Sequence, residues 1–312
     1  MSVQNALITS HQYHGLNLGL LKARHRTAGV NKTLAFAAYE EKTICSISGK
    51  GYIDTLWFGM SVNNTFLKNA RLKVFVDGES TPSLNFDLGS LGLHFSSGYT
   101  NGWTEHVFTE TNSSYPAEVV CFRFPIPYST GIVIQIKSNV AQTSSISTYA
   151  YYVPDADIPL RLKSVNVPYD GKITILGSEN TVYEFFNLSG EGWIVWHSMA
   201  MEPVTDNSHL QSKLSINLNG EGTPSIDSVN LLNWFMDSND FNEWPMSTSW
   251  KMLSICPNGL FYPKKFNVGV DLLELFGGIR FDSGARAVLD TTPAAMATDF
   301  SFGHTWLYYQ PT

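Results

Sequence analysis

The amino-acid sequence predicts an all-β chain that forms two tandem eight-stranded jelly rolls, related by an internal duplication. Three observations predict this fold. A turn motif occurs twice, since "VDGESTPSL" at 76–84 returns as "LNGEGTPSI" at 218–226. Short runs rich in β-branched and aromatic residues fill most of the chain and are bounded by Gly, Pro, Asn and Ser. The composition is also typical of a β protein with many turns.

The composition excludes several classes of protein. Hydrophobic residues make up 43% of the 312 residues and aromatic residues 13%, whereas charged residues make up only 15%, against about 25% in an average domain. The net charge of −7 argues against a specific nucleic-acid partner, because phosphate contacts need a basic surface. No apolar run reaches the length of a membrane span, and the N-terminus lacks the pattern of a secretory signal, so a soluble protein is expected.

The cysteines do not indicate a metal site or a disulfide framework. Cys45, Cys121 and Cys256 are odd in number and far apart. Their spacing matches no zinc motif. We therefore expect them to be buried apolar residues, and the sequence predicts neither a cofactor nor a metal site.

The repeated turn belongs to a longer series of matches. Three further pairs of segments resemble each other in the same order, and the offset between the partners grows slowly from 141 to 157 residues. The pairs are 48–53 with 189–194, 127–136 with 280–289, and 147–152 with 304–309. Duplication of a whole domain, followed by small loop insertions, produces such a series.

Each half of the chain reads as a series of short strands. In the first half we expect strands at 43–48, 52–60, 70–78, 119–126, 131–138 and 148–154. In the second half we expect them at 172–178, 181–188, 192–200, 213–220, 252–257, 267–273, 286–292 and 304–310. Segments 90–95 and 229–237 are predicted to be helical turns. About eight strands per copy, with long loops, favours a jelly roll over an immunoglobulin sandwich.

The boundary between the copies is expected within 152–164, where two prolines and several charges interrupt the strand pattern. We therefore predict an N-terminal arm at 1–42, a first jelly roll at 43–158 and a second at 159–312.

The two repeated turns are predicted to be structural. Asp77-Gly78 and Asn219-Gly220 are strong hairpin signals, because glycine tolerates a positive φ. Pro82 and Pro224 follow, each of which favours an extended backbone at the residue before it.

These residues resemble a known family. The segments "ARLKVFVDGESTPSLNFDLGSLGLHF", "VVCFRFPIPYSTGIVIQIKSN" and "FGGIRFDSGARAVLDTT" are similar to the double-jelly-roll glycoside hydrolases that act on fructofuranosides and arabinofuranosides. Those proteins share their fold with the double-jelly-roll major capsid proteins of icosahedral viruses. The resemblance covers most of residues 45–312 and implies a trimer.

The sequence departs from the hydrolase pattern where a catalytic carboxylate is expected. After the second turn the chain reads "DSVNLLNWFMDSNDF", with Asp227, Asp237 and Asp240 but no Glu. A glycosidase needs two carboxyl groups about 5–10 Å apart. No catalytic residue is therefore assigned.

Other polar clusters are open to a functional interpretation, although surface loops explain them better. Trp103 beside Glu105, Glu110 and Glu118 has the composition of a sugar-binding loop. Two further groups have residue types that ligate metals but lack a full ligand set. They are His11 with His14, and Asp237 with Asp240 and Glu243.

The arm carries a short basic series. Lys22, Arg24 and Arg26 alternate along the chain, which suits contacts on an inner surface with phosphate groups of a genome or of lipids. A solvated segment is the alternative.

The hypothesis that best fits these features is a viral major capsid protein that forms pseudo-hexameric homotrimers and tiles an icosahedral shell. The expected partners are neighbouring capsomers, minor capsid proteins and, through the arm, an internal lipid membrane. The expected location is the virion, after assembly in the host cytoplasm. The alternatives are a furanoside-directed glycoside hydrolase or an inactive sugar-binding relative, and a virion spike or receptor-binding protein.

Overall fold

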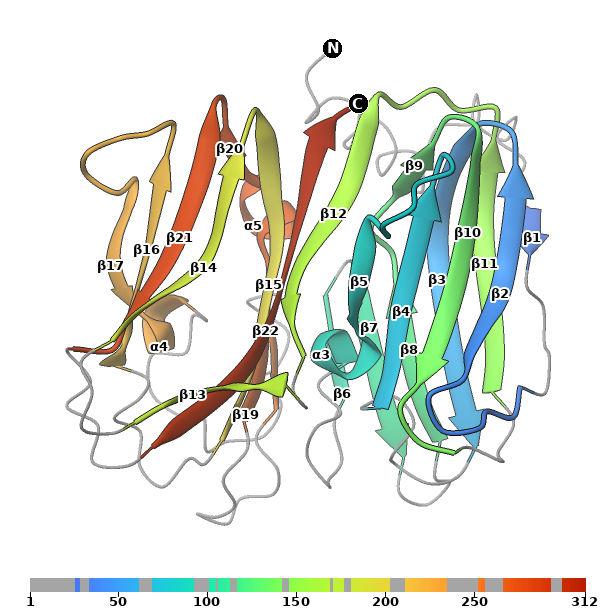
Figure 1. The fold of residues 1–312 in the computed structure, drawn as a ribbon, viewed down its shortest axis with the longest axis horizontal. Helices are drawn as coiled ribbons and strands as arrows, with labels where there is room; N and C mark the ends of the chain where they lie inside the picture. The colour runs from blue at the N-terminus through green and yellow to red at the C-terminus, as the bar shows by residue number, and fades with distance from the viewer. Residues whose placement is uncertain are drawn as a thin grey trace.

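A computed structural model of the chain shows two β-sandwiches side by side (Figure 1). The structure describes residues 26–28, 34–61, 69–92, 101–104, 106–112, 117–141, 146–168, 171–176, 181–202, 211–234, 252–255, 266–292 and 299–312.

The first sandwich consists of two antiparallel sheets. One has the strand order β1-β11-β3-β8-β7-β6, with β9 paired to β3, and the other has the order β2-β10-β4-β5. The bounds are β1 Arg26–Ala28, β2 Glu41–Ser48, β3 Gly51–Ser61, β4 Ala70–Val76, β5 Leu84–Asp87, α3 Leu88–Gly92, β6 Asn101–Trp103, β7 Val107–Asn112, β8 Ala117–Phe122, β9 Ile126–Tyr128, β10 Gly131–Ser138 and β11 Ile146–Pro154.

The second sandwich repeats this arrangement. One sheet has the order β12-β22-β15-β19-β18, with β13 paired to β22 and β20 to β15, and the other has the order β14-β21-β16-β17. The bounds are β12 Leu160–Val167, β13 Ile173–Ile175, β14 Val182–Ser189, β15 Gly192–Glu202, β16 Lys213–Leu218, β17 Ile226–Asn230, α4 Leu231–Trp234, β18 Met252–Ile255, β19 Phe266–Asp271, α5 Leu272–Phe276, β20 Ile279–Phe281, β21 Gly284–Asp290 and β22 Phe300–Pro311.

The same eight-stranded unit therefore occurs twice. The order β11-β3-β8-β7 faces β2-β10-β4-β5 in the first copy, and β22-β15-β19-β18 faces β14-β21-β16-β17 in the second. Strands β2 and β14 have the same length and the same alternation of exposed and buried residues. The predicted fold class, two tandem jelly rolls, is confirmed.

Strand pairing shows which residues of β11, the last strand of the first copy, correspond to which residues of β22, the last strand of the second. Tyr52 pairs with Val153 in the first copy, and Trp193, which is 141 residues after Tyr52, pairs with Tyr309 in the second. Val153 therefore corresponds to Tyr309, an offset of 156 residues. The sequence match at an offset of 157 was wrong by one residue, and a shift of one residue exchanges the two faces of a strand.

The predicted boundary and two predicted strands differ from the observed structure. The segment expected to be an interdomain boundary includes β12, which pairs along its whole length with β22. The strand predicted at 119–126 is divided into β8 and β9, and the strand predicted at 267–273 ends at Asp271, where α5 begins. The limits 1–42, 43–158 and 159–312 stay a prediction, although β1, within the predicted arm, pairs with β11.

Two apolar cores hold the sandwiches together. One lies inside the second sandwich. The other fills the first sandwich and continues into the second, because Leu160, Trp196, Leu307 and Tyr309 belong to the same cluster. The sheet that contains β15 and β22 is thus buried on both faces, whereas exposed and buried residues alternate along much of β2 and β14.

Two of the cysteines are within the described residues. Cys45 is buried and Cys121 half-buried, and neither is in a disulfide. Burial raises the pKa of both thiols to about 11. Cys256 lies outside the described residues. None of the helices in the described part of the chain is long and apolar enough to cross a membrane.

The close approach of β15 and β22 makes Gly192 sensitive to substitution. A Cβ at this position would lie 2.5 Å from the Tyr309 carbonyl oxygen and 2.5 Å from Cζ of Phe281. We expect Gly192→Ala to lower the free energy of unfolding by about 1–3 kcal/mol, because backbone must shift. Urea denaturation checks this. Gly222→Ala is the matched control, since nothing lies within 4 Å of its Cβ, and an equal loss in both variants would contradict the prediction.

Candidate functional site

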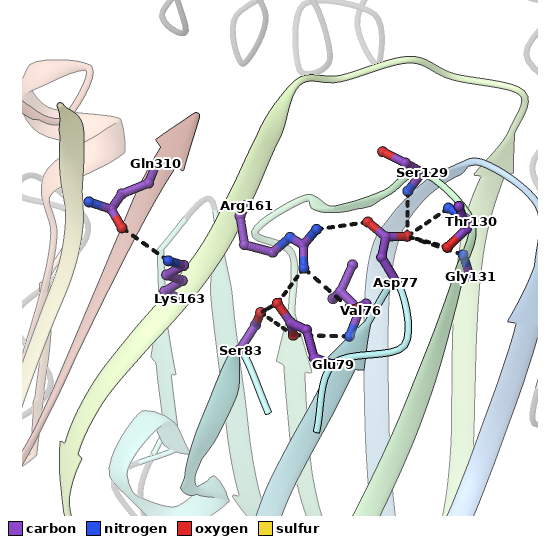
Figure 2. Close-up of polar contacts among 10 residues, drawn as sticks. All are labelled: Val76, Asp77, Glu79, Ser83, Ser129, Thr130, Gly131, Arg161, Lys163 and Gln310. Atoms are coloured by element: carbon purple, nitrogen blue, oxygen red, sulfur yellow. Dashed lines mark hydrogen bonds and ion pairs between the residues drawn. The ribbon is translucent and has the colours of Figure 1, made fainter. Parts of the chain in front are cut away.

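The feature with the clearest geometry is the contact between the two sandwiches. Strand β12 of the second sandwich packs against β5 and β9 of the first. Arg161, on β12, faces the repeated turn that follows β4 (Figure 2). The site therefore joins residues that are more than 80 positions apart in the chain.

Arg161 binds two carboxylates of this turn. Its Nη2 lies 2.7 Å from Oδ2 of Asp77, and its Nη1 pairs with Oε1 of Glu79. Nη1 also donates to the carbonyl oxygen of Val76 at 3.4 Å. All three charged side chains are mostly shielded from solvent. A guanidinium group suits this position, because its planar donors can bind two acceptors at once.

Asp77 is also held by backbone amides. Its Oδ1 accepts hydrogen bonds from the amides of Ser129, Thr130 and Gly131 at 2.8, 2.6 and 3.2 Å. Partial burial by itself raises the pKa of Asp77. The hydrogen bonds from Thr130, Ser129 and Gly131, with the charge of Arg161, outweigh burial and hold the pKa below its ordinary value.

The two repeated turns have the same backbone geometry. Asp77 and Gly78 have φ values of 55° and 78°, and Asn219 and Gly220 have 56° and 70°. Positive φ at both central residues is typical of a tight hairpin turn, and Asp, Asn and Gly tolerate it. Pro82 and Pro224 lie between each turn and the next strand.

The second turn uses an amide in place of the carboxylate. Oδ1 of Asn219 accepts from the backbone amides of Asp282 and Ser283 at 2.5 and 3.0 Å. Its amide nitrogen consequently occupies the place that Oδ2 has in Asp77. Among the described residues, no arginine or lysine pairs with Glu221, the counterpart of Glu79.

Polar contacts continue along the rest of the interface. The Ser164 hydroxyl accepts from the Asn85 amide at 2.9 Å, and the Ser164 amide donates to the Ser83 carbonyl oxygen at 3.0 Å. Further contacts join Ser90 Oγ with Thr305 Oγ1 at 2.7 Å, His106 Nδ1 with Asp271 Oδ2 at 2.8 Å, and the Tyr309 hydroxyl with the Pro125 carbonyl oxygen at 2.7 Å. Hydrogen bonds as well as apolar burial therefore join the two sandwiches.

The turn at 218–225, which corresponds to the covered turn at 76–83, is mostly exposed. Asp77 and Glu79 are half-buried and Ser83 is buried, whereas their counterparts in the second turn, Asn219, Glu221 and Ser225, are all exposed. The two turns differ in exposure because β12 lies over the first turn, whereas no described segment lies over the second.

Sequence reasoning missed a cluster of buried histidines in the second sandwich. The His197 ring stacks on Trp306 at 3.6 Å between centroids, and its Nδ1 accepts from the Trp234 indole at 2.8 Å. His304 Nε2 lies 3.3 Å from the Tyr183 hydroxyl. Burial lowers the pKa of both histidines, that of His304 to about 3. No motif spacing could have indicated this cluster, because its members come from β14, β15, α4 and β22.

The candidate site residues from the sequence are divided between the described and the remaining parts of the chain. His11, His14, Lys22, Arg24, Glu105, Asp237, Asp240 and Glu243 lie outside the described residues. Arg26 begins β1, Trp103 is on β6, Glu110 is on β7 and Glu118 is on β8, but their side chains are not described. Asp227 is exposed on β17. Among the described residues, no three His, Cys, Asp or Glu side chains are grouped to hold a metal ion.

The comparisons with known proteins agree with the predicted resemblance. Residues 26–155 match the family model "GH172 first beta-sandwich domain". This match covers the first sandwich, from β1 to the residue after β11. No curated protein sequence matches the chain.

Similar solved structures include two viral proteins. The major capsid protein P2 of bacteriophage PM2 has a TM-score of 0.49 and 10% identity, over 92% of this chain and 97% of that chain. The Sputnik virophage structure has a TM-score of 0.30 and 10% identity, over 92% of this chain and 85% of that chain.

Removal of the interface arginine tests the energetic weight of this site. We expect Arg161→Met to lower the free energy of unfolding by about 1–3 kcal/mol, because it leaves two partly buried carboxylates without their counter-charge. Arg286→Met is the control, since Arg286 pairs with Glu184 at the surface and such pairs contribute less than about 1 kcal/mol. Urea denaturation at neutral pH measures both, and equal losses would count against a structural role for Arg161.

The histidine cluster predicts a loss of stability in acid. The unfolded chain binds a proton at each histidine below pH about 6.5, whereas His304 stays neutral in the fold until about pH 3. Stability should therefore fall as the pH decreases from about 6.5, and the contribution of His304 to this loss should be about 2 kcal/mol at pH 5. Urea denaturation of wild type and His304→Gln at pH 7.5 and 5.0 checks this. The variant should lose less than wild type, and an identical loss would show that His304 does not contribute.

Proposed function

We propose that the protein is the major capsid protein of an icosahedral virus, and that three copies form a ring of six sandwiches that tiles the shell. The single observation that carries this proposal is that the two sandwiches in one chain meet through different surfaces: the β12 side of the second sandwich lies against the β5 side of the first. The surfaces that meet inside one chain recur at its two ends, where their described residues are exposed or half-buried.

The first of these surfaces is the outer face of the sheet that contains β1, β11 and β3. In the second sandwich the corresponding face is covered, and Ser198, Thr305 and Leu307 are fully buried. Their counterparts by strand pairing are Trp57, Tyr149 and Tyr151. These three aromatic residues are half-buried or exposed, with ring centroids of neighbours 5.2 and 6.4 Å apart. Exposed aromatic groups of this kind are typical of protein interfaces.

The second surface is the edge of β17 with the turn before it. Strands β17 and β1 lie at opposite ends of the long axis, and β5 and β12 meet in the middle (Figure 1). A second copy can therefore place its β1 face against β17, as β12 lies against β5. Such a heterologous contact closes into a ring of three chains if each step between sandwiches turns by about 60°.

The arm and the shell add further expected contacts. In this proposal the arm at 1–42, with Lys22, Arg24 and Arg26, links neighbouring chains or faces an internal membrane. Minor capsid proteins and other trimers are the remaining partners, and the protein resides in the virion after assembly in the host cytoplasm. The shell protein has no catalytic role.

The second candidate is a furanoside-directed glycoside hydrolase or a sugar-binding relative. The match of residues 26–155 to a GH172 sandwich favours it. Incubation of the purified chain with aryl arabinofuranosides and fructofuranosides distinguishes the two, because release of the aryl alcohol supports a hydrolase and contradicts a purely structural role.

Electron microscopy and mass photometry of the purified full chain test the capsid proposal. We expect particles with the mass of three 34.7-kDa chains that have a nearly hexagonal outline and form hexagonal arrays. A chain that stays monomeric at all concentrations, or that forms open fibres, would contradict it.

One substitution tests the aromatic surface directly. Tyr151→Asp should weaken the trimer, because it places a charge in an apolar contact. Leu176→Asp is the control, since Leu176 is exposed to a similar extent, 43% against 38% for Tyr151, but lies beside β13, outside the expected interface. Equal effects of both variants would contradict this choice of surface.

A further inference from the structure

We propose that the turn at 218–225 binds a basic residue from a second copy of this chain, and that this residue is Arg24. The contact would repeat between chains what Arg161 does within one chain. It depends on the trimer proposed above and names the residues that hold it together.

The acceptor side is visible in the structure. The Glu79 amide donates to the Val76 carbonyl oxygen, and the Glu221 amide donates to the Leu218 carbonyl oxygen, at 3.1 and 3.0 Å. The hydroxyl of a serine four residues further on contacts each glutamate carboxylate. In the first turn, the Glu79 carboxylate and the Val76 carbonyl oxygen accept from Nη1 of Arg161. The Glu221 carboxylate and the Leu218 carbonyl oxygen have the same arrangement in the second turn.

The donor side follows from strand register. Lys163 pairs opposite Tyr308, and Arg26 pairs opposite Tyr152. Tyr308 and Tyr152 correspond, because they pair with Ile194 and Ile53. Arg26 is therefore the counterpart of Lys163.

The sequence extends this correspondence in both directions. Arg24 precedes Arg26 by two residues, as Arg161 precedes Lys163. On the other side, Thr27 matches Ser164, and both residues carry a hydroxyl group. The alternation of basic residues in the arm is thus explained as a copy of the β12 pattern, and Arg24 is the expected partner of Glu221.

The two contacts differ in strength. Asp77 offers a carboxylate oxygen to Arg161, whereas Asn219 presents an amide nitrogen at that place, which cannot accept from a guanidinium. The contact between chains consequently has one ion pair where the contact within a chain has two. A weaker contact suits association of separate chains, because it lets misplaced subunits dissociate.

The difference between Asn219 and Asp77 suggests a substitution that should make the trimer more stable. Asn219→Asp restores the second carboxylate, and the φ of 56° at this position suits Asp, as Asp77 has 55°. We expect the concentration at which the trimer dissociates to fall by roughly tenfold. Mass photometry over a dilution series measures it on the full chain.

Charge reversal provides the complementary test. Glu221→Arg and Arg24→Glu should each weaken the trimer by roughly tenfold or more, and the double variant should recover most of the loss. Glu191→Arg is the charge-matched control, because Glu191 is also an exposed glutamate of the second sandwich. Far-UV circular dichroism and thermal melting establish that each variant folds.

The outcomes separate this contact from the assembly itself. A wild-type trimer that is unaffected by Glu221→Arg, or single variants that the double variant does not rescue, would overturn the contact and leave the capsid proposal intact. A wild-type chain that never forms trimers would overturn both. Tighter association of Asn219→Asp together with rescue in the double variant would support the contact.

Discussion

The burial of one sheet on both of its faces is the constraint on which the architecture depends. The strands β15 and β22 contribute one face to the core of the second sandwich and the other to the core of the first. The second sandwich thus shields apolar surface that would otherwise be exposed to water, and the apolar area removed from water stabilises the pair. The two sandwiches are held as one unit by this sheet, and its outer face determines what the free ends of the molecule can contact.

Polar groups set the register of this apolar contact. Apolar packing is nondirectional, so it does not by itself fix how far one sandwich slides along the other. The hydrogen bonds of Ser164 with Asn85 and Ser83, and the ion pairs of Arg161, occur only at one relative position. A displaced arrangement would leave partly buried carboxylates without a partner, which costs more than the pairing itself contributes. Specificity of alignment is therefore the main consequence of this network.

Duplication explains both the likeness and the divergence of the two halves. The two copies share the backbone geometry of the repeated turns, the register shift between their two central strands, and the lengths of β2 and β14 and of β3 and β15. The side chains have diverged where the environments differ. Thr305 and Leu307 are fully buried against the first sandwich, and their counterparts Tyr149 and Tyr151 are larger aromatic residues at a free surface. Such asymmetry is expected when one contact forms within a chain and the related one forms between chains.

The sequence by itself determined the duplication, the all-β class and the two repeated turns, because these features depend on local patterns. The patterns are short runs of β-branched and aromatic residues, the Asp-Gly and Asn-Gly pairs, and matching segments that occur in the same order in both halves. The tertiary structure alone decided three other features. It made a strand of 160–167, whose composition resembled a boundary, because β22 offers hydrogen-bond partners along its whole length. It set the offset of 156 residues, since an aromatic run such as "YAYY" aligns with "WLYY" in either register until cross-strand partners are known. It also brought Arg161 to Asp77 and gathered the buried histidines from distant strands, and these contacts depend on distances in space that no spacing along the chain encodes.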